Sequence, residues 1–124
     1  MMGILYNEGV KKMEFKKTIA VDFDGVLNNY HGYDPDDLGT IRDGAREFIE
    51  CLYLKYSIII YSTRDSTSIR HWLKKYHLDK YITKVSNKKP PAVAYIDDRA
   101  IRFNGDYTKC LHDFTEKAYW QEDD

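Results

Sequence analysis

The sequence predicts an α/β domain whose mainly parallel sheet carries helices on both faces. Short apolar runs rich in β-branched residues alternate along the chain with amphipathic stretches of helical period, which is typical of parallel strands joined by helical crossovers. With 124 residues, 43% of them hydrophobic, the chain has the length and composition of one globular domain with a single core. We place this domain at residues 15–124 and expect residues 1–14 to be a poorly ordered or surface extension.

Four apolar runs are predicted to form the strands of the sheet. The first, residues 18–21, leads into two carboxylates one residue apart and then a glycine. The others occupy residues 57–61, 81–85 and 92–96, and each stops at charged or turn-forming residues. A fifth short strand is predicted at residues 101–103, ahead of an Asn-Gly turn.

The first predicted helix follows a loop rich in turn-forming residues. Thr40 and Asp43 resemble a capping box in which Asp replaces the usual Glu. Apolar residues then recur at helical spacing, so the helix is expected to end near Tyr56. Cys51 on this helix and Cys110 on the last one are predicted to be buried, reduced thiols.

Two further helices are predicted. The second is capped by Asp65 or Ser66, and its apolar stripe is expected to face the core. That stripe consists of Ile69, Trp72, Leu73 and Tyr76. The last helix is amphipathic and runs from Tyr107 to Ala118.

Charge and hydropathy narrow the range of partners. The net charge is −1, so no global field attracts nucleic acid or an anionic membrane, although local basic clusters stay open. No apolar run approaches the length of a membrane span, and the N-terminus lacks the long apolar core of a signal peptide. We therefore expect a cytoplasmic protein with no membrane partner.

Polar and charged side chains follow each of the four main strands. They are Asp22 and Asp24, Ser62, Lys89, and the pair Asp97 and Asp98. The carboxyl ends of parallel strands meet at one edge of a sheet, where ligands bind in open α/β folds. Four carboxylates gathered there would repel one another unless a hard divalent cation such as Mg²⁺ held them. The lysine and the serine hydroxyl provide the cation and the donor that phosphate oxygens need, so the sequence predicts a site for Mg²⁺ and phosphate.

Each of these residues alone also has an ordinary structural role. Asp-Gly is a common turn pair, Ser62 could cap or turn, and Lys89 could be a solvated loop charge. Thr63 and Lys88, at the adjacent positions, remain alternatives for them. The roles of three arginines stay open between substrate binding and structural ion pairs: Arg64, Arg99 and Arg102.

Taken in this order, the motifs resemble those of the haloacid dehalogenase (HAD) superfamily of phosphatases. Residues 22–26, Asp-Phe-Asp-Gly-Val, are similar to the first motif of that family, and Ser62 at the end of the second apolar run resembles the second motif. Lys89 before a proline matches the third motif, and the pair Asp97-Asp98 matches the fourth. The resemblance covers nearly the whole domain and implies a Rossmann-like sheet.

The resemblance also implies a role for each residue. Asp22 would attack phosphorus in line and form an aspartyl-phosphate, and Asp24 would protonate the leaving oxygen and then activate water. Mg²⁺ would be held by Asp22, the main-chain carbonyl of Asp24, and Asp97 or Asp98. The serine and lysine of the second and third motifs would hold the transferred phosphoryl group. The second acid, Asp24, distinguishes phosphatases of this family from its dehalogenases and favours phosphate esters as substrates.

The predicted function is therefore a Mg²⁺-dependent phosphomonoester hydrolase. Its expected partner is a phosphorylated substrate, whether a small molecule, a nucleic-acid end or a phosphoprotein. No stretch is long enough for a full cap domain, so we expect an open site, unless a loop or a second subunit of a homo-oligomer closes it. Two alternatives stay open: a catalytically silent module that binds phosphate or metal, and a subunit that needs a partner. A phospho-receiver domain is disfavoured. In such a domain the acidic pair comes early and the lysine comes last, whereas in this chain an acidic pair, Asp97-Asp98, follows Lys89.

Overall fold

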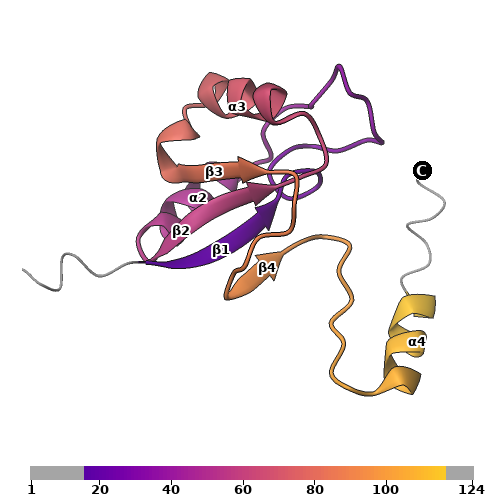
Figure 1. The fold of residues 1–124 in the computed structure, drawn as a ribbon. Helices are drawn as coiled ribbons and strands as arrows, with labels where there is room; N and C mark the ends of the chain where they lie inside the picture. Colours follow the sequence, from indigo (N-terminus) through magenta and orange to yellow (C-terminus); the bar gives the residue numbers. More distant parts are fainter. Residues whose placement is uncertain (1–15, 117–124) are drawn as a thin grey trace, which may run out of the picture.

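The computed structural model describes residues 16–116 as an α/β unit built on one sheet (Figure 1). The four strands are β1 (Lys17–Asp22), β2 (Tyr56–Tyr61), β3 (Ile82–Ser86) and β4 (Ala94–Ile96). They pair in parallel in the order β3-β2-β1-β4, an arrangement compatible with a Rossmann-like fold. The extension predicted at residues 1–14 lies outside the described residues.

Three α-helices and one short 3₁₀ helix accompany the sheet within residues 16–116. They are α2 (Ala45–Tyr53), α3 (Ser66–Lys75), η2 (Asp79–Tyr81) and α4 (Tyr107–Glu116). The predicted cap of the second helix is confirmed, because the Asp65 carboxylate accepts a hydrogen bond from the backbone N–H of Ser68 at 3.0 Å. Within residues 16–116, no helix has the length and apolar character needed to cross a membrane.

The core lies on one face of the sheet. Alternate side chains of the two central strands point to this face, and those that are buried are Ile19, Val21, Ile58 and Ile60. Helices α2 and α3 both pack on this face, with buried side chains at Ala45, Ile49, Ile69, Trp72 and Leu73. The Phe23 and Trp72 rings meet edge to face with centroids 4.8 Å apart, so the turn after β1 is anchored in the same core.

No helix covers the opposite face of the sheet among the described residues, so the prediction of helices on both faces is wrong there. The connections through α2 and α3 step in the same direction along the sheet, and right-handed crossovers in one direction place both helices on one face. The return from β3 to β4 is the loop 87–93, which contains no helix. Ile59 and Tyr61 of this face are therefore half-buried, and Tyr95 is 44% exposed.

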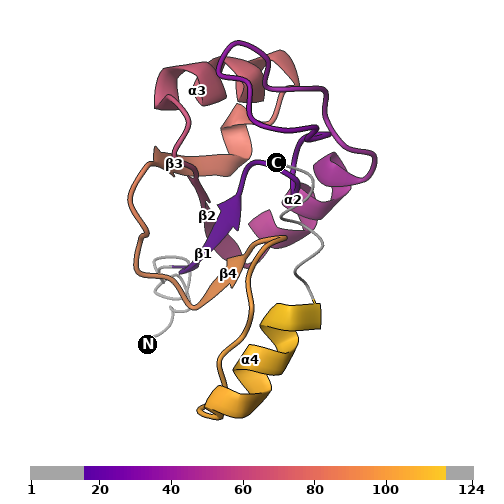
Figure 2. The same cartoon turned by 90° about the vertical axis from the view of Figure 1, so that its right-hand side faces the viewer.

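Helix α4 projects away from the sheet at the end of the irregular segment 97–106 (Figures 1 and 2). The predicted amphipathic helix is present, but none of its residues is buried, and Tyr107, Leu111 and Phe114 are exposed. Its predicted end at Ala118 lies outside the described residues. The apolar stripe that the sequence shows is therefore not a core face in this structure.

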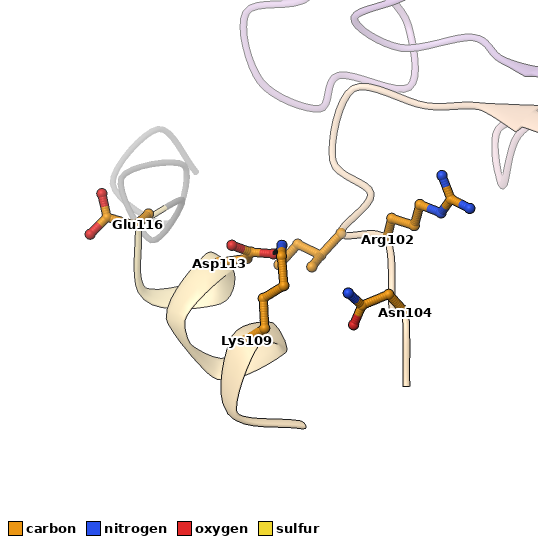
Figure 3. A pocket seen from close by; sticks show the side chains of 6 residues that line it. Arg102, Asn104, Lys109, Asp113 and Glu116 are labelled. Atoms are coloured by element: carbon orange, nitrogen blue, oxygen red, sulfur yellow. Dashed lines mark hydrogen bonds and ion pairs between the residues drawn. The ribbon is translucent and has the colours of Figure 1, made fainter. Parts of the chain in front are cut away.

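A hollow separates α4 from the chain that leads into it (Figure 3). Arg102 and Asn104 line it from the irregular segment, and Lys109 and Asp113 line it from the helix. Lys109 and Asp113 form an ion pair of 2.6 Å one helical turn apart. Because Lys109 is exposed and Asp113 is only partly buried, this pair adds little to the stability of the protein.

Helix α2 begins later than the sequence predicts. Gly44 precedes its first turn and provides no side-chain cap. The Thr40 hydroxyl instead accepts a hydrogen bond from the Asn29 side-chain amide at 2.8 Å, and Ile41 forms an antiparallel bridge with Asn28. Thr40 and Ile41 therefore close the loop after β1 and do not open a helix.

Two further sequence predictions are wrong. Residues 101–103 form no strand. Cys51 is exposed and Cys110 is partly exposed, so neither is a buried thiol, although both are free. Cys51 lies away from the buried residues of α2, which are Ala45 and Ile49. The helical pattern places a residue on a helix, but the side that packs depends on where the sheet lies.

Candidate active site

The candidate site lies at the carboxyl edge of the sheet, where the sequence places it. Asp22 is the last residue of β1, between β2 and β4. Asp97 and Asp98 follow directly after β4. Each of these three carboxylates has an oxygen within 4.8 Å of an oxygen of the other two. Two neighbouring strands therefore bring Asp22 together with an acidic pair, Asp97 and Asp98, that lies far from it in the sequence.

The crowding of these carboxylates changes their proton affinity. Burial, together with the negative charges of Asp97, Asp98 and Asp24, raises the pKa of Asp22 from 3.8 to about 7, although the backbone N–H of Phe23 opposes the shift. Burial and the Asp97 charge also raise the pKa of Asp98. A set of oxygen donors that resists ionising together has the chemistry that a hard divalent cation satisfies, so these residues fit Mg²⁺.

Gly25 allows the acidic cluster to form. Its φ angle is +80°, in the left-handed region that favours glycine. A Cβ atom at this position would overlap the Asp98 carboxylate. The glycine that the sequence shows after Asp24 is therefore needed both for the turn after β1 and for the approach of the β4 carboxylate.

Asp24 turns away from the three-carboxylate cluster and is held by two donors. Arg64 Nε donates to both Asp24 carboxylate oxygens, at 2.9 and 3.0 Å, and the Asn28 amide donates to one of them at 3.0 Å. Asp24 still lines a cavity of about 200 Å³ together with Asp22 and Asp98. Its carboxylate is therefore fixed in orientation beside the residue predicted to be the nucleophile.

Arg64 forms a structural ion pair with Asp24, whereas the sequence left its role open between substrate binding and an ion pair. The side chain is almost completely buried, and its Nη1 donates to the carbonyl of Asp34 at 2.7 Å. Its guanidinium lies 4.9 Å from the centroid of the Tyr33 ring. Of the two alternatives, ion pair and substrate binding, the structure shows the ion pair with Asp24. Arg64 thereby ties the loop after β1 to a predicted catalytic acid.

Asn28 is a residue that the sequence analysis missed. It is 1% exposed, it accepts a hydrogen bond from the Gly25 N–H at 2.8 Å, and it donates to the Leu38 carbonyl at 2.6 Å. Only the turn-forming composition of the loop hinted at such a role, because the partners lie 3 to 10 residues away. Asn28 and Arg64 together fix the loop and Asp24 relative to each other.

Ser62 and Lys89 approach Asp22 from two sides. Ser62 lines the cavity that also contains Asp22 and Asp24, and its hydroxyl accepts a hydrogen bond from the Arg64 N–H at 3.1 Å. Lys89 lines a second cavity of about 290 Å³ with Asp22 and Asp97. Asp22 borders both cavities.

The structure thus brings the six predicted residues to one edge of the sheet, while their roles remain predictions. The adjacent alternative Thr63 also lines the first cavity and is exposed, whereas Ser62 is 5% exposed. Lys88 lines neither cavity of the site. Arg99 lines the cavity that contains Asp22 and Asp24, and Arg102 lies in the hollow beside α4.

Comparisons of the chain with protein-family models, with curated proteins and with solved structures return no match.

Proposed function

We propose that this protein is a Mg²⁺-dependent phosphomonoester hydrolase that acts through an aspartyl-phosphate, as its resemblance to the HAD phosphatases implies. One observation carries the proposal. Asp22 lies at the carboxyl edge of the sheet, and Asp97 and Asp98 each have a carboxylate oxygen within 4.8 Å of an oxygen of Asp22. Asp24, which Arg64 holds, lines the same cavity as Asp22. This arrangement provides a nucleophile, ligands for a cation and a proton donor in one place.

The first step uses Asp22 as the nucleophile. One of its carboxylate oxygens attacks phosphorus, the bond between phosphorus and the leaving-group oxygen breaks, and Asp24 gives its proton to that oxygen. Attack requires the ionised carboxylate, whereas burial and like charges raise the Asp22 pKa to about 7. Bound Mg²⁺ supplies the positive charge that favours ionised Asp22 and offsets the phosphoryl charge. Asp22, the main-chain carbonyl of Asp24, and Asp97 or Asp98 would hold it.

The second step releases the product. Asp24, now ionised, takes a proton from water, which attacks phosphorus of the aspartyl-phosphate. The bond between phosphorus and the Asp22 oxygen breaks, so inorganic phosphate leaves and the Asp22 carboxylate is restored. Arg64 and Asn28 hold Asp24 in one orientation, which suits an acid that must reach the same position in both steps.

Ser62 and Lys89 are the residues that we assign to the phosphoryl oxygens. A hydroxyl donor and an ammonium group in two cavities that Asp22 borders would position the group for in-line attack. The connection between β1 and α2 contains only an isolated bridge and no cap domain. The site is therefore open to substrates larger than a small metabolite.

The test is hydrolysis of para-nitrophenyl phosphate by the full chain, with Mg²⁺ and with EDTA. We expect activity that requires Mg²⁺ and falls at least ~10³-fold in Asp22→Asn. Asp36→Asn, an exposed carboxylate of the same loop, is the matched control and should keep its activity.

Two outcomes would contradict the proposal. Activity that persists in Asp22→Asn or in EDTA would exclude this mechanism. Mg²⁺ binding without hydrolysis of aryl, nucleotide and sugar phosphates would instead support the catalytically silent module that the sequence left open.

A further inference from the structure

We propose that the substrate of this site is the phosphorylated end of a single-stranded nucleic acid, whose backbone binds a basic surface on α3, η2 and β3. The identity of the reaction rests on the proposed function, but the binding surface does not. This basic surface consists of Arg70, Lys74, Lys75, Lys80, Lys84 and Lys88, all of which are exposed.

The basic surface is a local departure from the charge of the chain. Residues 70–89 contain seven of the 19 Lys and Arg residues and a single acidic residue, Asp79. This segment therefore carries a net charge of +6 in a chain whose net charge is −1. Exposed like charges repel one another, and a polyanion relieves that repulsion with the release of its own counterions.

The fold places these charges on both faces of the sheet beside its edge strand β3: α3 packs on the core face, whereas Lys84 pairs in register with Ile59 of the opposite face. Helix α3 and strand β3 lie side by side (Figure 1), and a hollow of about 320 Å³ between them is lined by Arg70 and Lys74. Strand β3 begins two residues after Lys80 and runs about 17 Å toward the carboxyl edge, with Lys84 in its middle. Basic side chains therefore lie along β3 as far as the carboxyl edge of the sheet, where Asp22 lies.

Lys89 joins the basic surface to the candidate active site. It follows β3 in the sequence and lines the cavity that contains Asp22. A chain of phosphates along β3 would therefore present its last phosphate to the predicted nucleophile. The absence of a cap between β1 and α2 in the described residues leaves room for the rest of the polymer.

Aromatic side chains stand beside Asp22 where a terminal base would lie. Tyr61 and Tyr95 line the same cavity as Asp22 and Lys89. The Tyr95 hydroxyl donates to the Pro90 carbonyl at 2.7 Å, which fixes the ring, and Lys89 Nζ lies 4.6 Å from its centroid. Stacking on a tyrosine requires an unpaired base, so these rings favour a single strand over a duplex.

The composition of the surface favours a nucleic-acid backbone over a phosphopeptide. Five of its six residues are lysines, which act as point charges, and they are spread along an edge. A single phosphorylated side chain is typically held by a compact group of arginines that donate in pairs. A row of lysines matches a polymer with one charge per repeat.

The experiment measures binding by the full-length Asp22→Asn protein, which removes turnover. The probes are fluorescent oligonucleotides of about 12 nucleotides with a 3′-phosphate, a 5′-phosphate or no phosphate, with a duplex, polyglutamate and anionic vesicles as competitors. We expect single strands to bind, with an affinity that falls steeply as salt rises. Lys74→Glu combined with Lys84→Glu should weaken binding at least tenfold, and Lys17→Glu combined with Lys55→Glu, at exposed lysines elsewhere, should not.

Each other outcome overturns the inference. These outcomes are no binding at low salt, equal competition by duplex, polyglutamate or vesicles, and equal loss in both double variants. The neutral pair Lys74→Gln and Lys84→Gln, checked by circular dichroism, guards against loss of folding. If wild-type protein hydrolyses the aryl phosphate but neither phosphorylated oligonucleotide, the substrate inference fails and the proposed function stands. If Asp22→Asn binds single strands but wild type hydrolyses no ester, the proposed function fails together with the substrate that depends on it, and only the binding surface stands.

Discussion

Residues 17–86 and residues 94–116 differ in how far their apolar side chains are buried. In the first region, strands β1 to β3 bury a continuous core under α2 and α3, and Ile49, Ile58 and Ile69 have no exposed surface. In the second region, β4 is three residues long and α4 has no buried residue. The two regions meet at the carboxyl edge, because β4 pairs with β1.

This difference shows that buried apolar surface is distributed unequally in the molecule, whereas both regions contribute predicted site residues. The first region contributes Asp22, Asp24 and Ser62 on strands and turns that the core fixes. The second contributes Asp97 and Asp98 on a segment that three register pairs attach to the sheet. Damage to the core should therefore abolish both folding and chemistry, whereas damage to α4 should leave the fold intact.

Among the substitutions considered, one in the core of the first region is expected to lower the free energy of unfolding most. Ile58→Ala removes a side chain with no exposed surface from the central strand β2. We expect a loss of about 3–4 kcal/mol in the free energy of unfolding, from lost burial and the cavity that remains. Urea denaturation measures it. A loss below about 1 kcal/mol would mean that this face is not the core of the protein.

The next effect concerns the ion pair that holds Asp24. Arg64→Gln removes a buried donor to both Asp24 oxygens and to the loop after β1. We expect a loss of about 2 kcal/mol in stability and a fall in kcat with little change in KM, since Asp24 is misplaced for proton transfer. Arg64→Lys should recover part of the stability but less of kcat. Wild-type kinetics in Arg64→Gln would show that Asp24 needs no positioning by this residue.

A smaller effect is the pH dependence of stability without divalent cations. Folded Asp22 keeps its proton up to about pH 7, whereas the unfolded chain releases it near pH 3.8. Stability therefore falls as pH rises through this interval, by about 1–2 kcal/mol after allowance for solvent screening. The difference in Tm between wild type and Asp22→Asn in EDTA, measured across the interval, should change in favour of the variant. Added Mg²⁺ should reduce that difference, and a pH-independent difference would contradict the raised pKa.

The smallest effect is expected in the second region. Leu111 is 68% exposed on α4, so Leu111→Ala removes little buried surface. We expect a change below about 0.5 kcal/mol in the free energy of unfolding. A loss above about 1 kcal/mol would show that α4 packs against another surface in solution, which would remove the contrast between the two regions.

Local sequence patterns predicted much of the fold. The apolar runs that form β1 and β2 are rich in β-branched residues and bounded by charges. Asp65 lies at the start of an amphipathic stretch. In each case residues close in the sequence decide the local conformation. The same logic failed at Thr40, whose hydroxyl has its partner at Asn29. It also failed for the second face of the sheet, because the handedness of two crossovers, and not their periodicity, decides which face α2 and α3 cover.

The candidate site shows the same division between local and distant information. The motif order placed Asp22, Asp97 and Asp98 at one edge, since parallel strands end together. It did not reveal that Arg64 holds Asp24 across 40 residues of sequence, or that Asn28 holds the loop. These partners depend on a loop path that no local pattern specifies.

We propose that Asp22 becomes phosphorylated during turnover. The most direct test is mass spectrometry of the protein quenched in acid while it hydrolyses para-nitrophenyl phosphate with Mg²⁺. We predict one added phosphoryl group on the peptide that contains Asp22, absent in EDTA and in Asp22→Asn. Turnover with no phosphoryl group on this peptide, or with the group on another residue, would contradict the claim.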